Sequence, residues 1–334
     1  MPISRQQLSQ REIEGVLDQY ALGKVNTIDE LAAGSVYSPK VVISADRGRF
    51  LLKRRARGLD IPSVVAFSHE VILGCLERGV CVPPLVGTAS ENNSMVHFGD
   101  HVYELFVFIE GQMFDRSASM IGTHARQAGA LLGEVHAVLD QIRPGFEPPV
   151  EPATIDLTRM GVLDQRVDAI DADTGHRLKQ ILGYGEELSK ANARRPSIVH
   201  GDWHPGNMIY RQGEIVAVCD FDNTRIGSRA RELAQAMIHF SLKAPQAGQS
   251  AHNCDPDPDL DGLANFWRGY ASYAPPACSA KVCVGLMPAV MIDEALASIG
   301  QDESGNAMLV AVARKAIWID EHQSTLVSML EATQ

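Results

Sequence analysis

The sequence predicts an α+β protein with two lobes, an N-terminal antiparallel sheet with a helix and a larger, mostly helical C-terminal lobe. Three observations support this prediction. Before residue 110, short runs alternate between apolar and polar residues or are rich in β-branched residues, a pattern typical of strands. After residue 110, apolar residues recur at helical spacing in long segments. One β-rich stretch, residues 198–222, interrupts this helical part. The expected lobes are residues 1–108 and 109–334.

The N-terminal elements are expected in the following order. Residues 5–20 have the pattern of a short amphipathic helix. Two strands near 41–43 and 50–52 are joined by the turn-forming residues 45–48. A helix over 62–78 has Pro62 near its start and Gly79 after its end. Two further strands lie near 94–99 and 102–109.

The C-terminal lobe is expected to consist of long helices around the β-rich stretch. Residues 245–261 are polar and rich in Asp and Pro, which predicts a surface loop. The predicted helices lie near 117–140, 161–192, 228–243, 258–273, 281–299 and 306–331.

Composition excludes several classes of protein. The 334 residues are 45% hydrophobic and 21% charged, which is typical of a globular chain with about two domains. The net charge of -11 and the lack of a basic stripe argue against a nucleic-acid partner. No apolar run is long enough to span a membrane. The start of the chain lacks a secretory signal, and six scattered cysteines form no CxxC pair, which together predict a cytoplasmic protein.

The β-rich stretch contains the clearest chemical motif. Asp202 and Asn207 are separated by four residues in a tight loop between two apolar runs. This is the spacing of a kinase catalytic loop, where the Asp accepts the proton of the substrate hydroxyl and the Asn binds Mg²⁺. Thirteen residues after Asn207, an apolar run ends at Asp220, and a second Asp at this place holds Mg²⁺ on the phosphates of ATP in kinases. Asp222 could add a ligand through water.

The N-terminal part should then supply a lysine for the phosphates and a carboxylate to orient it. Lys53 ends the run of residues 50–53, and Glu70 follows on the predicted helix 62–78. An ion pair between them would aim the ammonium at the α- and β-phosphates. Glu77 on the same helix is a rival for this role. Residues 33–38, which include Ser35, could fold over the phosphates, although they lack a GxGxxG pattern.

Two motifs together resemble the aminoglycoside phosphotransferase/choline kinase superfamily. They are HGDWHPGN at 200–207 and CDFDN at 219–223. Supporting similarities are LLK at 51–53, IEG at 109–111, LLGEVH at 131–136 and RELA at 231–234. Two departures are the loop sequence GSVYSP at 34–39 and Glu232, where the family typically has Asp.

The resemblance implies a protein-kinase-like fold and a role for several residues. Asp202 would be the catalytic base, and Asn207 and Asp220 would bind Mg²⁺. Lys53 would pair with Glu70. Backbone groups near Val107 and Ile109 would meet the adenine of ATP.

We therefore expect an ATP-dependent phosphotransferase that moves the γ-phosphate of MgATP to a hydroxyl of a small molecule. The acceptor could be a sugar or amino sugar, an amino alcohol or an aminoglycoside. On a C-terminal helix, Asp293 and Glu294 form either a solvated face or a site for a substrate amine. A protein kinase is disfavoured because no APE-like anchor follows Asp222. A nucleotide-binding pseudokinase or scaffold is the remaining alternative, and the presence of Asp202, Asn207 and Asp220 argues against it.

Overall fold

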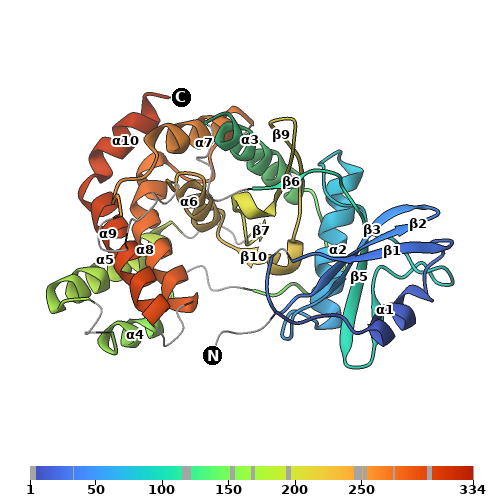
Figure 1. Ribbon diagram of the computed structural model, residues 1–334. Coiled ribbons are helices and arrows are strands. Elements are labelled where there is room, and N and C mark those ends of the chain that lie inside the picture. Colours follow the sequence, from blue (N-terminus) through green and yellow to red (C-terminus); the bar gives the residue numbers. More distant parts are fainter. Residues whose placement is uncertain are drawn as a thin grey trace.

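The structure is a computed structural model that places an antiparallel sheet at one end of the molecule and a helical lobe at the other (Figure 1). This confirms the predicted fold class. The residues that the structure describes are 5–32, 34–114, 122–150, 155–166, 170–192, 197–243, 250, 254–273, 275–298 and 303–333.

The N-terminal sheet has five strands in the order β1-β2-β3-β5-β4, and all neighbours are antiparallel. The strands are β1 (Val25–Glu30), β2 (Lys40–Ala45), β3 (Gly48–Arg54), β4 (Val96–Phe98) and β5 (His101–Val107). Helix α1 (Gln10–Leu17) packs on the sheet, and helix α2 (Pro62–Glu77) lies between the sheet and the helical lobe (Figure 1).

The register of this sheet aligns three charged residues in one row. Lys40 on β2 pairs with Lys53 on β3, which in turn pairs with Glu104 on β5. Directly opposed residues point to the same face of a sheet. The row therefore presents two ammonium groups and one carboxylate to the interior of the molecule.

Two small sheets lie between the lobes. One contains β6 (Gln112–Met113), β8 (Met208–Arg211) and β9 (Glu214–Val218), and the other pairs β7 (Ser197–Val199) with β10 (Arg225–Gly227). Two short 3₁₀ turns, Pro205–Asn207 and Phe221–Asn223, precede β8 and follow β9. The motif residues lie on these turns and on the loop after β7.

The helical lobe has its largest packing contact between α3 and α7. Two glycines allow the backbones to approach closely, because a Cβ at Gly129 would lie 2.1 Å from the Phe266 carbonyl oxygen and one at Gly269 would lie 2.0 Å from that of Arg126. The helices of this lobe are α3 (Gly122–Leu139), α4 (Met160–Asp164), α5 (Ala172–Ala191), α6 (Arg229–His239), α7 (Leu260–Tyr273), α8 (Ala280–Ser298), α9 (Glu303–Glu321) and α10 (Gln323–Glu331).

Some predicted elements differ from the structure. The expected helix over 161–192 is two helices, α4 and α5, and the one over 306–331 breaks at His322 into α9 and α10. Strand β1 was not predicted, because five of its six residues are exposed and give no apolar alternation. Residues 117–121, and residues 245–249 and 251–253 of the predicted loop 245–261, lie outside the described residues. Among the helices that the structure describes, none is long and apolar enough to cross a membrane.

Candidate active site

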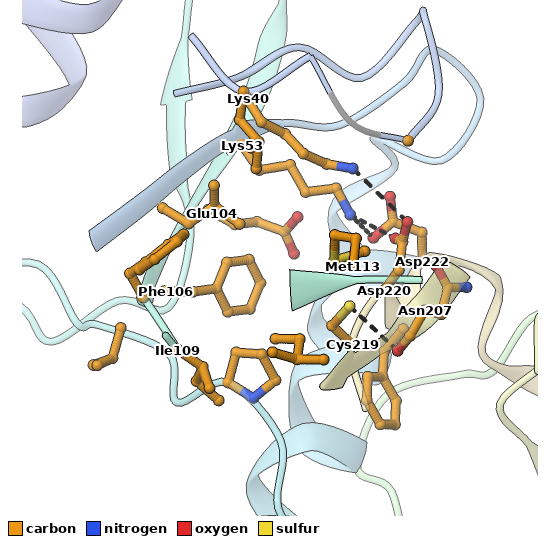
Figure 2. Close-up of a pocket in the computed structure, with 18 of the residues that line it drawn as sticks. Lys40, Lys53, Glu104, Phe106, Ile109, Met113, Asn207, Cys219, Asp220 and Asp222 are labelled. Carbon is orange, nitrogen blue, oxygen red and sulfur yellow. Dashed lines mark hydrogen bonds and ion pairs between the residues drawn. The ribbon is translucent and has the colours of Figure 1, made fainter. Parts of the chain in front are cut away.

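A pocket opens between the N-terminal sheet and the small β6-β8-β9 sheet, and Asn207, Asp220 and Asp222 of the two motifs lie at one end of it (Figure 2). Its other end is apolar and is formed by the chain that connects the lobes. The residues at this apolar end include Phe106, Val107, Ile109, Met113 and Ile209. One pocket thus combines an apolar wall with a charged end.

In the loop after β7, the backbone of Asp202 is held by the neutral side chain of His200, which is itself bonded to the backbone of Cys219. The Asp202 N–H donates to His200 Nδ1 at 3.3 Å, while His200 Nε2 donates to the Cys219 carbonyl at 3.2 Å. Burial lowers the pKa of His200, so its ring is neutral at pH 7 with the proton on Nε2. At Gly201, φ is +82° and a Cβ would lie 2.2 Å from the Asn223 carbonyl oxygen, so the loop needs glycine there.

His204 faces the carboxylate of Asp202. The Gly206 N–H donates to His204 Nδ1 at 3.0 Å, which leaves the ring proton on Nε2, 3.5 Å from Asp202 Oδ1. Burial alone would raise the pKa of Asp202, but the hydrogen bond from His204 outweighs it, so the pKa lies below its ordinary value. Asp202 is therefore ionised at neutral pH, as a proton acceptor must be.

A backbone hydrogen bond brings the two predicted metal ligands together. The Cys219 N–H donates to the Asn207 carbonyl at 2.9 Å, so the end of β9 lies beside the catalytic loop. Asn207 Nδ2 donates to the backbone oxygen of Asp202 at 2.9 Å and to its Oδ2 at 3.1 Å. With its nitrogen so used, the Asn207 side-chain oxygen is the atom left to act as a ligand.

Asp220 leaves β9 in the left-handed region, with φ of 67° and ψ of 63°. A non-glycine residue adopts this conformation at a cost and most often at a functional site. The amide oxygen of Asn207 and the carboxylate of Asp220 are hard oxygen donors that suit Mg²⁺, which takes one or two protein carboxylates and completes its shell with water and phosphate. The described residues contain no cluster of three or more His, Cys, Asp or Glu that could hold a metal. The residues therefore fit a metal bound together with phosphates better than an all-protein metal site.

Lys53 lies at the charged end of the pocket and contacts two carboxylates (Figure 2). Its Nζ is 2.8 Å from Asp220 Oδ1 and also donates to Asp222 Oδ1. Burial alone would lower the pKa of Lys53, but the two carboxylates outweigh it and raise the pKa. The same ammonium, with that of Lys40, holds the pKa of Asp220 well below its ordinary value, against the effect of burial. Burial raises the pKa of Asp222.

The expected ion pair between Lys53 and Glu70 does not form. The Glu70 carboxylate instead accepts the Gly145 N–H at 2.9 Å and the Phe146 N–H at 3.3 Å. The reason is the rotation of α2, which turns His69 toward the sheet and Glu70 toward the segment after α3. The rival Glu77 is 75% exposed at the end of the same helix, so neither carboxylate of α2 serves Lys53.

The carboxylate that faces Lys53 from the N-terminal lobe is Glu104, which was not among the residues predicted from the sequence. It is fully buried, and Arg55 binds it with two hydrogen bonds of 2.8 Å. His69 Nε2 lies 2.6 Å from its Oε1. Arg55 also lies 3.3 Å from Asp222. The signal that could have found Glu104 is its register opposite Lys53, which requires knowing the strand pairing.

The remaining predicted nucleotide contacts are placed as follows. Val107 and Ile109 both line the pocket, but the Val107 N–H already donates to the Pro84 carbonyl at 2.8 Å. Ser35 does not line the pocket. Its hydroxyl accepts the Tyr37 N–H at 3.2 Å, and its neighbour Gly34 lines the pocket instead.

Glu232, the departure from the expected Asp, supports the catalytic loop from below. One of its oxygens accepts the Gly201 N–H at 2.6 Å, and the other lies 2.7 Å from His136 Nε2. His136 Nδ1 is in turn 2.7 Å from the Tyr270 hydroxyl. All these groups are buried. The catalytic loop is thus anchored on α6, α3 and α7.

The two acidic residues of α8, Asp293 and Glu294, differ in their exposure and in their partners. Asp293 is 1% exposed and paired with Arg159 and Arg231, so it is structural. Glu294 is 26% exposed, lies 3.4 Å from His239 and accepts a hydrogen bond from Gln235. The His239 ring is 5.8 Å from that of His204. Glu294 is thus linked through His239 and His204 to the loop that carries Asp202.

Comparison with known proteins gives a consistent result. The sequence profile described as the phosphotransferase enzyme family matches residues 30–274. No curated protein matches the chain in sequence.

Several solved structures share the fold. A microcompartment-associated aminopropanol kinase has a TM-score of 0.71 at 15% identity, covering 96% of this chain and 99% of the other. An amicoumacin kinase, solved with AMP-PNP, Ca²⁺ and amicoumacin, has a TM-score of 0.67 at 14% identity, covering 94% of each chain. An aminoglycoside phosphotransferase from Alicyclobacillus acidocaldarius has a TM-score of 0.62 at 17% identity, covering 96% of each chain.

Proposed function

The chain belongs to the phosphotransferase enzyme family, and from this premise we propose that it transfers the γ-phosphate of ATP, bound with Mg²⁺, to a hydroxyl of a small molecule. The observation that carries the proposal is the convergence of three pocket-lining residues, Lys53, Asn207 and Asp220, with Asp202, whose carboxylate accepts a hydrogen bond from Asn207. They come from the sheet, the loop after β7 and the end of β9.

The pocket supports the placement of a nucleotide. Its apolar wall, which includes Phe106 and Ile109, suits a purine ring, and its charged end suits phosphates. The backbone N–H of Ile109 has no hydrogen-bond partner among the described residues. It can therefore donate to the edge of the base. In this orientation the base of the nucleotide lies at the chain that connects the lobes, and its phosphates lie at Lys53.

Asp202 has the geometry of the proton acceptor. Its carboxylate is held by Asn207 and faced by His204, so little motion is needed before it accepts the proton of a hydroxyl. Lys53 binds the phosphates and offsets the negative charge that develops during transfer. When bound on Asp220 and Asn207, Mg²⁺ supplies further neutralisation of the phosphate oxygens. The protein thus acts mainly by positioning and electrostatics.

The acceptor side favours a small molecule that carries an amine. Glu294 is a half-buried carboxylate beside Asp202's loop, and its partners His239 and Gln235 leave it without a permanent cation. An ammonium group bound there would bring an adjacent hydroxyl toward Asp202. The similar structures named as aminopropanol kinase and aminoglycoside phosphotransferase act on acceptors of this kind. We therefore place amino alcohols and amino sugars ahead of neutral sugars.

The test is the release of ADP from MgATP in the presence of pooled amino alcohols, amino sugars, neutral sugars and aminoglycosides. Wild type is compared with Asp202→Asn, which removes the proton acceptor but keeps the shape of the side chain. Release that depends on one pool, in wild type alone, supports the proposal, and testing that pool's members identifies the acceptor. If MgATP binds but no pool increases release, a nucleotide-binding scaffold becomes the better interpretation.

A further inference from the structure

We propose that Lys40 is a second phosphate-binding lysine that acts together with Lys53 on the terminal phosphates of the nucleotide. This inference rests on the proposed function and adds a residue that neither motif contains. Lys40 begins β2 and lies directly opposite Lys53 in the sheet. Figure 2 shows both ammonium groups pointing to the carboxylate of Asp220 at the charged end of the pocket.

The two lysines differ in how well their charges are satisfied. Lys53 contacts Asp220 and Asp222 closely and its side chain is 4% exposed. Lys40 Nζ lies 3.9 Å from Asp220 Oδ2, and within the described chain this is its single ion pair. Its side chain is 11% exposed, so water compensates only in part. A shielded ammonium with one distant partner is a site for an anion.

The loop formed by residues 34–39, before β2, approaches this ammonium at Gly34. Gly34 has a φ of +74°, and a Cβ there would lie 2.6 Å from Lys40 Nζ. Arg5 donates to the backbone oxygens of Gly34 and Ser35 at 3.0 and 3.2 Å, which fixes the loop in place. The loop and Lys40 thus form one side of the pocket, and the absence of a side chain at Gly34 leaves the ammonium accessible from it.

The charges at this end of the pocket are balanced before any ligand binds. Three cations, Lys40, Lys53 and Arg55, face three carboxylates, Glu104, Asp220 and Asp222. If Asp220 held a divalent metal, Lys40 would lose its one ion-pair partner among the described residues. Lys40 would then bind a phosphate oxygen in place of this distant carboxylate.

The first test measures nucleotide affinity by calorimetry for wild type, Lys40→Met and Lys40→Arg. Lys40→Met should weaken MgATP binding by about tenfold or more, since a charge-assisted hydrogen bond is lost. Lys40→Arg should restore most of this affinity, and AMP, which lacks the outer phosphates, should bind all three proteins alike. Lys24→Met, which removes an exposed lysine before β1, is the matched control and should bind as wild type does.

Two outcomes would overturn the inference while leaving the proposed function intact. One is MgATP binding by Lys40→Met that equals binding by wild type. The other is an equal loss of affinity for MgATP and AMP, which would indicate a structural role. Wild type that does not bind MgATP would instead overturn the proposed function, and this inference with it.

A second test needs no variant and answers the question even if Lys40→Met does not fold. Wild type is treated with formaldehyde and a borane reductant, and methylation of each lysine is followed by peptide mass spectrometry. MgATP should slow the methylation of Lys40 several-fold, whereas Mg²⁺ alone or AMP should not, and Lys24 should react at the same rate throughout. Equal rates at Lys40 with and without MgATP would overturn the inference.

Discussion

The two sides of the candidate active site hold their charged groups in different ways. On the nucleotide side, lysine and arginine side chains are paired with carboxylates, so each group occupies the place where a ligand would bind. On the catalytic-loop side, Asp202 and Asn207 are held by backbone groups, by each other and by neutral histidine. When a ligand binds, the charged groups of the nucleotide side must give up their present ion pairs. The groups of the catalytic-loop side already hold their positions before a ligand binds.

Because of this difference, we expect substitutions on the two sides to affect different quantities, the affinity for the nucleotide and the rate of phosphate transfer. Residues on the nucleotide side should mainly affect the binding of metal and nucleotide, because their present partners compete with the ligand. Residues that support the catalytic loop should mainly affect the rate of transfer, because they determine the position of the proton acceptor. The predictions below test whether the two regions are independent in this sense.

The largest expected effect is on turnover. Asp202→Ala removes the proposed proton acceptor and should lower kcat by about 10²- to 10⁴-fold, the usual contribution of a general base. The affinity for MgATP should stay close to that of wild type, because the nucleotide-side ion pairs are unchanged. Steady-state rates and calorimetry measure the two quantities, with the exposed Asp173→Ala as control. A loss of nucleotide affinity as large as the loss of turnover would show that the regions are coupled.

Asp220→Ala should have the opposite profile. It removes one predicted metal ligand and the shared partner of Lys40 and Lys53. We expect MgATP binding to weaken by about tenfold or more, since one charge-assisted contact contributes on the order of 1.5–3 kcal/mol. The enhancement of nucleotide binding by Mg²⁺ should disappear in a magnesium titration. An enhancement equal to that of wild type would contradict the assignment of Asp220 to the metal.

Glu232→Gln tests the support of the catalytic loop from α6. One of the two contacts, to the Gly201 N–H or to His136, becomes mismatched, and the cost is on the order of 1–3 kcal/mol of folding stability. We expect kcat to fall while the KM for ATP changes little. Thermal unfolding and steady-state kinetics measure these effects. A change confined to the KM for ATP would place Glu232 with the nucleotide side instead.

The buried neutral histidines predict a pH dependence of stability. Burial lowers the pKa of His136 and His200 in the folded protein below 6.5, so below pH 6.5 the unfolded chain binds more protons than the folded one. Stability is therefore complete above about pH 6.5 and falls as the pH drops toward the folded pKa values, by at most about 1.4 kcal/mol per pH unit for each histidine. Denaturant unfolding between pH 8 and 5 should show a smaller slope for His200→Gln than for wild type. Parallel slopes would contradict the neutral state of this ring.

The smallest effect is expected for Glu70→Gln. The side chain holds two backbone N–H groups at residues 145–146, so stability should fall by about 1 kcal/mol or less. The KM for ATP should not change, because Glu70 does not contact Lys53. Glu77→Gln on the same helix is the matched control. A raised KM for Glu70→Gln alone would revive the expected pair with Lys53.

The fold class and the closeness of the three motif residues could be predicted from the sequence because both depend on local patterns. Asp202, Asn207 and Asp220 belong to short segments whose spacing keeps them together once the β8–β9 hairpin forms. Lys40 and Glu104 could not be found in this way, because their meeting with Lys53 depends on the register of three strands distant in sequence. A shift of one residue would turn each side chain to the other face.

The prediction for Glu70 failed for a related reason. Sequence spacing indicated that a carboxylate lies on the helix after Lys53, but not which face that carboxylate occupies. Each residue advances about 100° around a helix, so the neighbour of a pocket-facing residue points elsewhere. In the structure His69 faces Glu104, and Glu70 faces the segment after α3.

The contact between Glu70 and residues 145–146 has a mechanical consequence. Helix α2 is fastened to the helical lobe by this contact, and its buried residues, among them Phe67 and Val71, belong to the same core as α3. A helix so fixed cannot swing outward on its own. The same helix is also joined to the sheet, because His69 Nε2 lies 2.6 Å from Glu104 Oε1, so moving the sheet away from α2 to admit a nucleotide would break this buried contact.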